Sequence, residues 1–504
     1  MKRYWQLITF GIIHALILLV LFRSGFYHNS SMEHDTSLFF NYASKVVGGA
    51  LPYQDFSIEY PPLALVFFIL PRLVASSLAA YQLAFAVEIL IFDCLGLFFL
   101  FKLSQRLKVK SYVTLAIYTI IVLAIGPIMI NRYDLIPAVM ALASLYAFSQ
   151  GHHKTAWAIL AAGTLTKIFP ALIAPVFLIY LICQRRYRKA ISGVAAMAVT
   201  AAIIVIPCLL ISPGGFWNSF SMQMNRGLHV ESLYSSFLLL GQNLGLTSVR
   251  IQMSGHTPIS VNAVSPEANA LAKIAPAVIL IALALVYWLF YRRNRSKIDS
   301  NLMDSPDDTI RVIRYSFLAV LVFLLTNSVF SPQYLIWLCP VVPLVIRPRR
   351  HVPWIMITLT AMVTYYIYPM HYNGFMRGSA QLNYVLLFRN LLLAALAVWL
   401  IVEKRETAAV SQKHPASRLA FKPYALAVSL AVAAVLVLFD QVALNEFTSA
   451  SQIDSGMPGG GMQPGGGSDN MQGGGFGNNQ AGGGPGNTPN NGGPGSGSQR
   501  PSGK

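Results

Sequence analysis

Residues 155–182 read TAWAILAAGTLTKIFPALIAPVFLIYLI, an apolar stretch interrupted by Lys167 and Pro170. Basic residues flank it on both sides, at 152–154 and at 185–189, which indicates that both ends lie on the same side of a membrane. Because Pro170 disfavours helix at the residue before it, we predict two half-length helices that turn within the bilayer near Lys167. Non-helical backbone at that depth needs protein or a water-filled cavity around it. A lysine that faces lipid costs about 2.5–3.5 kcal/mol, so we expect Lys167 at the bottom of a cavity open to the outside.

Apolar runs long enough to cross a membrane recur along nearly the whole chain. Of the 504 residues, 55% are hydrophobic and 11% are charged. A helix needs about 20 apolar residues to cross a hydrocarbon core of ~30 Å. Such runs include residues 6–22, 80–101, 190–211, 271–291, 382–402 and 423–443. A soluble core could explain one of them, but this recurrence indicates a polytopic membrane protein.

The net charge of +18 could suggest a nucleic-acid partner. Its distribution excludes that class, because the basic residues gather in short clusters at the ends of apolar runs. These clusters are residues 2–3, 102–110, 185–189, 292–297, 347–350 and 404–405. Clusters of this kind mark cytoplasmic loops. We therefore expect the lipid bilayer as a partner, and no nucleic acid.

Alternation of the apolar runs predicts an all-α membrane helix bundle with its N-terminus inside and its C-terminus outside. Counting the half-helices gives about 13 membrane segments. The external loops are then residues 23–79, 212–270 and 369–381. In the first loop, residues 61–70 are too short to span and form an interfacial or re-entrant piece broken at Pro71 and Arg72.

The composition changes sharply near residue 451. We assign residues 1–450 to one transmembrane domain. Residues 451–504 are rich in Gly, Asn, Pro, Gln and Ser and almost free of apolar residues. Such a segment cannot bury enough apolar surface to fold. We expect a disordered external tail, either a surface-binding tether or an inert linker.

Asp35, in the first external loop, is a candidate for a catalytic base. The apolar spacing at residues 38–42 predicts an amphipathic helix that starts near Asp35. In the first turn, the helix dipole would keep this carboxylate ionised. An ionised carboxylate at the mouth of a cavity suits a general base that activates an acceptor hydroxyl. The alternative, which the local sequence favours, is a helix N-cap with no chemical role.

Further polar residues flank the same external helix ends. Asp55 and Glu59 belong to the string QDFSIEYPP at 54–62, in which Tyr60 precedes two prolines. Glu59 either binds substrate hydroxyls or caps the short helix that follows. Arg132 and Asp134 form either an exposed ion pair, worth little, or a pair that lines the cavity near Lys167.

The second large loop adds a cation, an imidazole and a carboxylate in the string NRGLHVES at 225–232. An anionic lipid phosphate at the external face needs cationic partners, for which Lys167 and Arg226 are the best candidates. The string SPQY at 331–334 is a tight turn whose side-chain amide could bind a sugar. His371 is either a site residue or an ordinary interfacial histidine. The remaining candidates for substrate binding are His229, Glu231 and Gln333.

The motifs of nucleotide, zinc and serine-nucleophile sites are missing from the sequence. Without a nucleotide motif, a sugar donor is more naturally lipid-linked than nucleotide-linked. We therefore expect no cofactor, and no external carboxylate–histidine cluster demands a metal.

Several short strings, in this order and on one predicted side, resemble the GT-C superfamily of integral-membrane glycosyltransferases. The similarity is greatest to glycosyltransferase family 87, the polyprenyl-phosphate-mannose-dependent mannosyltransferase-like group. It covers roughly residues 5–400. The strings are Asp35, GALPY at 49–53, EYPP at 59–62, RYD at 132–134, Lys167 with Pro170, RGL at 226–228 with Glu231 and Ser232, and SPQY at 331–334.

This resemblance implies inverting transfer of a hexose, typically mannose, from a polyprenyl phosphate to an acceptor hydroxyl. The acceptor would be a glycan, a glycolipid or a protein. The resemblance makes Asp35 the base and Lys167 and Arg226 the phosphate binders, on the non-cytoplasmic face of the plasma membrane. A lipid or glycolipid flippase is the alternative from another class, since half-helix cavities also occur in transporters. A non-catalytic scaffold of a cell-envelope assembly is the third.

Overall fold

The computed structural model describes residues 4–24, 30–224, 226–253, 260–295, 306–345 and 351–403. The predicted span at 423–443 and the Gly-rich tail lie outside these residues. The helices are α1 Trp5–Arg23, α2 Ser30–Val47, α3 Ala64–Val74, α4 Leu78–Arg106, α5 Ser111–Ile125, α6 Leu135–Ser149, α7 His153–Thr166, α8 Ala174–Cys183, α9 Tyr187–Ile211, α10 Pro213–Met224, α11 Leu233–Asn243, α12 Pro266–Arg295, α13 Pro306–Thr326, α14 Val342–Val345, α15 His351–Tyr365, α16 Tyr372–Met376 and α17 Ala380–Val402.

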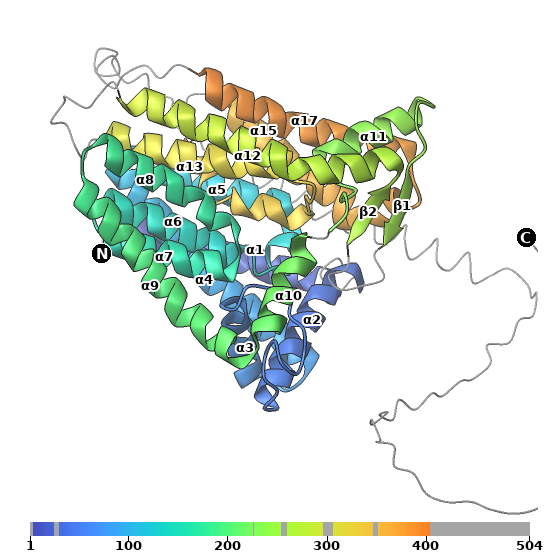
Figure 1. Ribbon diagram of the computed structural model, residues 1–504, viewed down its shortest axis with the longest axis horizontal. Helices are drawn as coiled ribbons and strands as arrows, with labels where there is room; N and C mark the ends of the chain where they lie inside the picture. The colour runs from blue at the N-terminus through green and yellow to red at the C-terminus, as the bar shows by residue number, and fades with distance from the viewer. Residues whose placement is uncertain are drawn as a thin grey trace, which may run out of the picture. The chain divides into compact units, whose positions relative to one another are not determined.

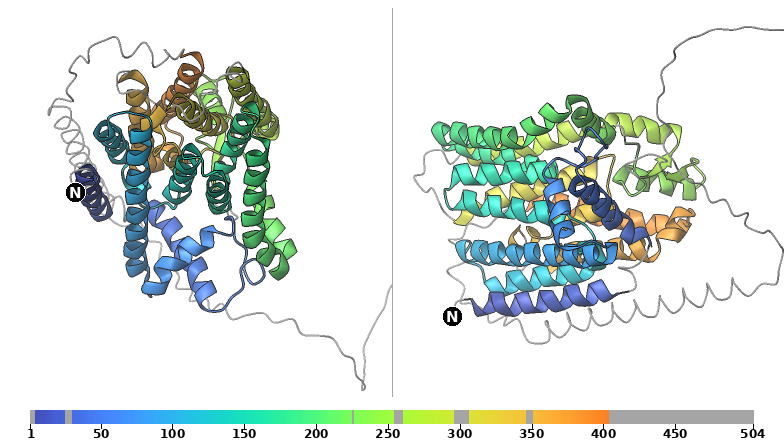
Figure 2. Two further views of the ribbon diagram at one scale, coloured as in Figure 1. Left: turned by 90° about the vertical axis from the view of Figure 1, so that its left-hand side faces the viewer. Right: turned by 90° about the horizontal axis from the view of Figure 1, so that it is seen from below.

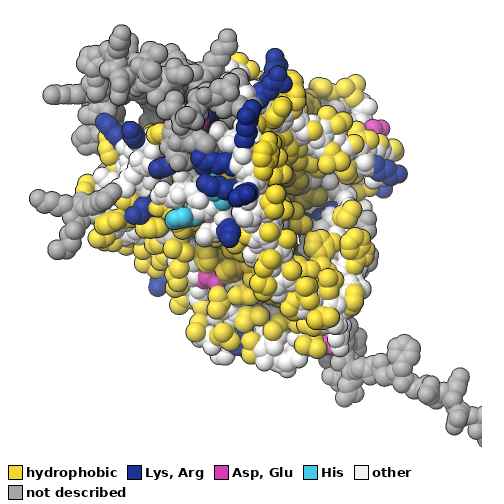
Figure 3. Space-filling view, turned by 60° about the vertical axis from the view of Figure 1, so that its left-hand side comes forward, with side chains coloured by type: hydrophobic (Ala, Val, Ile, Leu, Met, Phe, Trp, Pro, Cys, Tyr) yellow, Lys and Arg dark blue, Asp and Glu magenta, His cyan; other side chains and the backbone are white. Residues whose placement is uncertain are grey.

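The long helices run roughly parallel to one another and form a bundle (Figures 1 and 2). Within the described ranges, seven helices are long and apolar enough to cross a membrane: Trp5–Arg23, Leu78–Arg106, Ser111–Met129, Tyr187–Ile211, Pro266–Arg295, Pro306–Thr326 and Ala380–Val402. The prediction of a multi-pass helical membrane protein is therefore confirmed. The count of 13 segments and the sidedness of the two termini remain predictions. Lys and Arg side chains gather on one face with few Asp or Glu among them, as Figure 3 shows.

The predicted break at Lys167 is confirmed. Helix α7 ends at Thr166, Lys167 has extended backbone angles, and the 3-10 helix η2 (Phe169–Ile173) leads into α8. Aromatic contacts show that α8 returns toward the start of α7. The ring of Phe148, at the end of α6, lies 4.9 Å from that of His153 in α7 and 3.9 Å from that of Phe177 in α8.

Three details differ from the sequence-based expectations. Helix α2 begins at Ser30, so Asp35 lies beyond its first turn and the helix-dipole argument for this carboxylate was wrong. Helix α3 continues through Pro71 and Arg72 to Val74. The guanidinium of Arg72 donates to the carbonyl of Ala75 (3.0 Å) and to the hydroxyl of Ser44 (2.9 Å), which supports the helix end that we expected to break earlier.

The third difference is a small sheet in a bundle predicted to be all-α. Strands β1 (Arg250–Met253) and β2 (Val261–Val264) pair antiparallel, with Arg250 opposite Val264. They belong to the second predicted external loop, which also contains α10 and α11. Two short strands lack the length of the apolar runs on which the prediction was based, so the helical pattern hid them.

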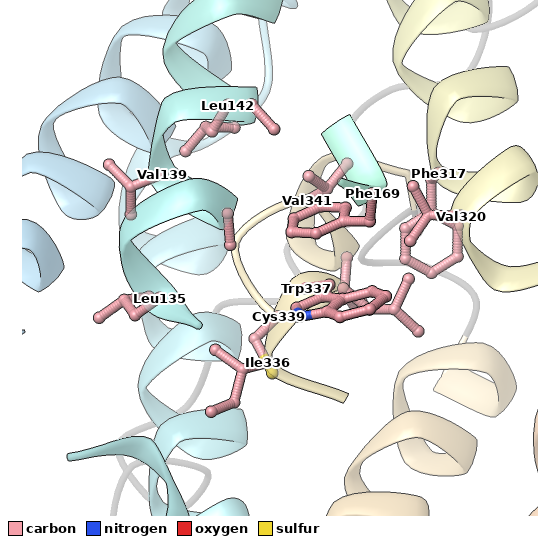
Figure 4. Close-up of a cluster of buried hydrophobic side chains, with 14 of the residues drawn as sticks. Leu135, Val139, Leu142, Phe169, Phe317, Val320, Ile336, Trp337, Cys339 and Val341 are labelled. Carbon is pink, nitrogen blue, oxygen red and sulfur yellow. The ribbon is translucent and has the colours of Figure 1, made fainter. Parts of the chain in front are cut away.

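The core beside the predicted cavity is a tight apolar cluster between α6, α13 and two 3-10 helices, η2 and η3 (Pro332–Trp337) (Figure 4). Leu135, Leu142, Phe317 and Ile336 are at most 2% exposed there. Between membrane helices, such packing stabilises the fold through van der Waals contacts. It also holds in place the two 3-10 helices, η2 just after Lys167 and η3 with Gln333.

Candidate active site

Four charged side chains from three segments meet, and we call them the charged cluster: Asp35, Arg132, Asp134 and Lys167. Asp35 comes from α2, Arg132 and Asp134 from the turn before α6, and Lys167 from the break after α7. These positions span more than 130 residues of sequence. The structure thus brings together the proposed base with three of the predicted binding residues.

Arg132 binds Asp35 directly. Its Nη1 contacts Oδ2 of Asp35, and its Nη2 donates to the hydroxyl of Tyr368 at 2.8 Å. The side chain of Asp35 is 25% exposed, whereas that of Arg132 is only 6% exposed. The carboxylate is therefore the member of this pair that solvent and a substrate can reach.

Asp134 pairs with a different cation, Lys167. Its Oδ1 lies 2.6 Å from Nζ of Lys167 and accepts a hydrogen bond of 2.6 Å from Nε1 of Trp337. Arg132 and Asp134, considered above as a mutual pair, thus have separate partners. The other alternative, a site beside Lys167, is what the structure supports.

Aromatic rings surround the ammonium group of Lys167. Its Nζ lies 4.6 Å from the ring centre of Tyr133, 5.4 Å from that of Tyr334 and 5.5 Å from that of Trp337. Cations are attracted to ring faces at such distances. These contacts, together with Asp134, compensate for placing a lysine whose side chain is only 15% exposed.

Glu59 lies beside the charged cluster and keeps an unused oxygen. The residue is 6% exposed, and its Oε2 has no hydrogen-bond partner among the described residues. Burial raises the pKa of Glu59 to about 7, although nearby Arg226 and a hydrogen bond from Tyr60 act in the opposite direction. Its backbone carbonyl accepts a hydrogen bond of 2.7 Å from the side chain of Gln223 in α10.

Tyr60 and Arg226 complete the surroundings of Glu59. The ring of Tyr60 packs edge-on against Phe39 and Tyr133, with centres 5.7 and 5.4 Å away. Arg226 hydrogen-bonds the hydroxyl of Tyr334, the same residue whose ring lies over Lys167. Arg226 is thereby held close to both Glu59 and the charged cluster, as expected for a second cation of the site.

His229 and Glu231 belong to a separate buried network. Glu231 pairs with Arg389 of α17 at 2.5 Å, and neither side chain is exposed. Asn390 donates to the backbone carbonyls of Glu231 and Ser232. Burial, with help from two arginines, lowers the pKa of His229 to about 3, so this imidazole is neutral at physiological pH. Buried in this way, Glu231 is not available to a substrate.

The last three candidates make local contacts. Asp55 is exposed and accepts the backbone N–H of Leu51 at 2.7 Å, which is a turn interaction. Gln333 accepts the hydroxyl of Ser331 at 2.5 Å. His371 is exposed and stacks on Tyr366, with ring centres 4.1 Å apart.

Tyr368 and Trp337 are site residues that the sequence reasoning missed. They hydrogen-bond residues 236 and 203 positions away. Trp337 follows the predicted SPQY turn by three residues, so an extension of that motif could have found it. No signal in the sequence marks Tyr368.

The charged cluster with Glu59 and Arg226 contains three carboxylates and three cations. Such a set can bind an anionic phosphate through its cations and accept a proton on a carboxylate. In the part of the chain that the structure describes, no group of three His, Cys, Asp or Glu residues could hold a metal ion.

Comparisons with known proteins find one family model that matches about half of the chain. The model of glycosyltransferase family 87 matches residues 58–303, which confirms the resemblance drawn from the sequence. The matched stretch contains Glu59, Arg132, Asp134, Lys167 and Arg226, and Asp35 precedes it. No curated protein matches the chain.

Two solved structures are similar over most of the chain. The crystal structure of ArnT from Cupriavidus metallidurans bound to undecaprenyl phosphate is 12% identical, with a TM-score of 0.41, and the match covers 78% of this chain and 77% of that one. The same protein in the apo state is 13% identical, with equal coverage and TM-score.

Proposed function

Since residues 58–303 match the model of glycosyltransferase family 87, we propose that this membrane protein transfers a hexose, mannose, from a polyprenyl-phosphate donor to an acceptor hydroxyl. The transfer inverts the anomeric centre and takes place on the non-cytoplasmic face of the plasma membrane. The acceptor is a glycan, a glycolipid or a protein. Under this proposal the protein is a glycosyltransferase of the GT-C superfamily.

The observation that carries the proposal is the charged cluster itself. A partly exposed carboxylate, Asp35, lies beside Arg132 and within the same set of residues as Lys167. A carboxylate with cations nearby suits a reaction in which a hydroxyl loses a proton while a phosphate leaves with negative charge.

The proposed step is a single displacement. Asp35 accepts the proton of the acceptor hydroxyl while the acceptor oxygen attacks the anomeric carbon. The bond between that carbon and the phosphate oxygen breaks, and the electron pair leaves with the polyprenyl phosphate. Lys167, Arg132 and Arg226 stabilise the phosphate charge. Attack from the face opposite the leaving group inverts the configuration.

Glu59 is suited to binding a hydroxyl group of the sugar. The free Oε2 of Glu59 can accept a sugar hydroxyl, and a carboxylate without another partner favours a ligand that supplies one. We therefore assign Glu59 to hydroxyl binding. Gln333, three positions before Ile336 of the buried core, is the proposed second hydroxyl ligand.

The test is transfer by the purified full-length protein in proteoliposomes given radiolabelled polyprenyl-phosphate mannose and a lipid or peptide acceptor. We expect label in the acceptor and release of polyprenyl phosphate in equal amounts. Movement of the labelled lipid between leaflets without transfer would instead support a carrier. If no polyprenyl-phosphate hexose is either transferred or moved between leaflets, the result would support the third alternative, a non-catalytic scaffold.

A further inference from the structure

Trp337 and Lys167 both bind the same carboxylate oxygen of Asp134. The indole Nε1 donates to Oδ1 of Asp134 at 2.6 Å, and Nζ of Lys167 lies 2.6 Å from the same atom. Figure 4 shows the nitrogen of the indole turned toward α6, whose first turn Asp134 precedes. Asp134 thus has two donors on one oxygen.

The indole cannot turn away easily, because rings cover both of its faces. Phe169 stacks on it with centres 4.4 Å apart and planes at 6°, and Tyr334 lies 4.2 Å from it with planes at 22°. Phe169 follows Lys167 by two residues. The direction of the N–H is therefore fixed by the same segment that carries the lysine.

The side chain of Asp134 is too buried to be without partners. It is 1% exposed, and its Oδ2 accepts no hydrogen bond from any residue within the described ranges. Removing one partner of a buried ion pair is strongly destabilising, because a buried charge remains. If Asp134 depended on Lys167 alone, the lysine would stay bound to it and could not reach a phosphate.

We propose that Trp337 is a positioning residue that makes Lys167 exchangeable. Its N–H stabilises the carboxylate of Asp134 while the ammonium group passes from Asp134 to the phosphate of a lipid-linked substrate. This proposal rests on the function proposed above and adds a residue to its donor site. It assigns to Asp134 the role of a resting partner for the lysine.

The first test is Trp337→Phe, which keeps an aromatic ring between Phe169 and Tyr334 and removes the N–H donor together with the second ring of the indole. We expect the Kd for undecaprenyl phosphate, measured on the purified full-length protein, to rise about 10-fold, since a hydrogen bond to a charged group is lost. Trp157→Phe is the matched control. Trp157 is also buried and packs edge-on against the ring of Phe177, but its Nε1 has no partner in the described part of the chain.

A double-mutant cycle separates this role from packing. In an Asp134→Asn background no carboxylate retains the lysine, so adding Trp337→Phe should change the Kd less than about 2-fold. An equal rise in both backgrounds would mean that Trp337 only packs and would overturn the proposal. If Asp134→Asn does not fold, Lys167→Met replaces it, because Trp337→Phe should then leave the residual Kd unchanged.

The wild-type protein keeps the two proposals distinct. If it does not bind undecaprenyl phosphate at all, both the donor site and the role of Trp337 are wrong. If it binds, and Trp337→Phe binds as tightly as Trp157→Phe, only the role of Trp337 is wrong.

Discussion

The charged cluster and the network around Arg389 are built from the same kinds of residues and differ in exposure. In the cluster, the side chains of Asp35 and Lys167 are 25% and 15% exposed. In the network, Arg389 and Glu231 are both fully buried and bind each other at 2.5 Å. Arg389 also donates to Asn390 and to the backbone of Glu231. Residual exposure therefore separates the ion pairs that we propose to be reactive from the fully buried pair of the network.

The network around Arg389 holds a loop in place, and this role requires no access to solvent. It ties the loop that follows Arg226 to α17, and the backbone N–H groups of His229 and Val230 bind Ser328 and Val261. Through these contacts three distant segments hold the loop in place. A charge needed only for this purpose has no reason to be accessible.

Among changes to the cations of the two regions, the largest effect should come from removing Lys167, one of the two cations of the charged cluster. For Lys167→Met we predict a fall in transfer of about 10²–10³-fold, since a charge that stabilises the leaving phosphate is lost. The measurement is initial rate with labelled polyprenyl-phosphate mannose. Lys154→Met, at an exposed lysine of helix α7, which ends just before Lys167, is the control, and an equal fall in both variants would count against the assignment.

Removing the cation of the network should affect stability instead. Arg389→Met leaves Glu231 buried without its partner, which costs about 3–5 kcal/mol. We predict a clear fall in Tm, whereas the rate per folded molecule stays within about 3-fold because the two sites are separate. If Arg389→Met kept a normal Tm but lost transfer, Arg389 would have a role in the reaction rather than in stability.

The smallest effect concerns pH. Burial raises the pKa of Glu59 from 4.5 to about 7, so the folded protein binds this proton more tightly than the unfolded chain. The stability linked to it is full below pH 4.5 and is lost as the pH rises toward 7. Glu59→Gln cannot ionise, so its Tm relative to wild type should rise by about 2 °C between pH 5 and pH 8. If the difference in Tm between Glu59→Gln and wild type did not change with pH, the pKa of Glu59 would not be raised in the folded protein.

Much of the fold follows from local patterns. The break at Lys167 was predictable because Pro170 restricts the backbone and basic residues flank both ends of the stretch. The start of α2 was not, because the string Glu33-His34-Asp35 has the composition of a helix start and only tertiary packing extends the helix back to Ser30.

The partners in the site were less predictable than its members. Lys167 stands out as a charge in an apolar stretch, and the family resemblance singles out Asp35 and Arg226. Their pairing does not stand out. Arg132 binds Asp35 rather than Asp134, which is only two positions away in sequence, and the Trp337 that binds Asp134 lies 203 positions further along the chain. Side-chain partners over such separations depend on the packing of several helices, which no local pattern encodes.

The central claim is that Asp35 is the base of a glycosyl transfer at the charged cluster. The most direct measurement compares the transfer rates of Asp35→Asn and Asp55→Asn, two isosteric changes in the same predicted loop. We predict a loss of about 10²–10⁴-fold for Asp35→Asn, the range of general-base catalysis, with undecaprenyl phosphate still bound and transfer by Asp55→Asn close to wild type. Substantial turnover by Asp35→Asn would contradict the account.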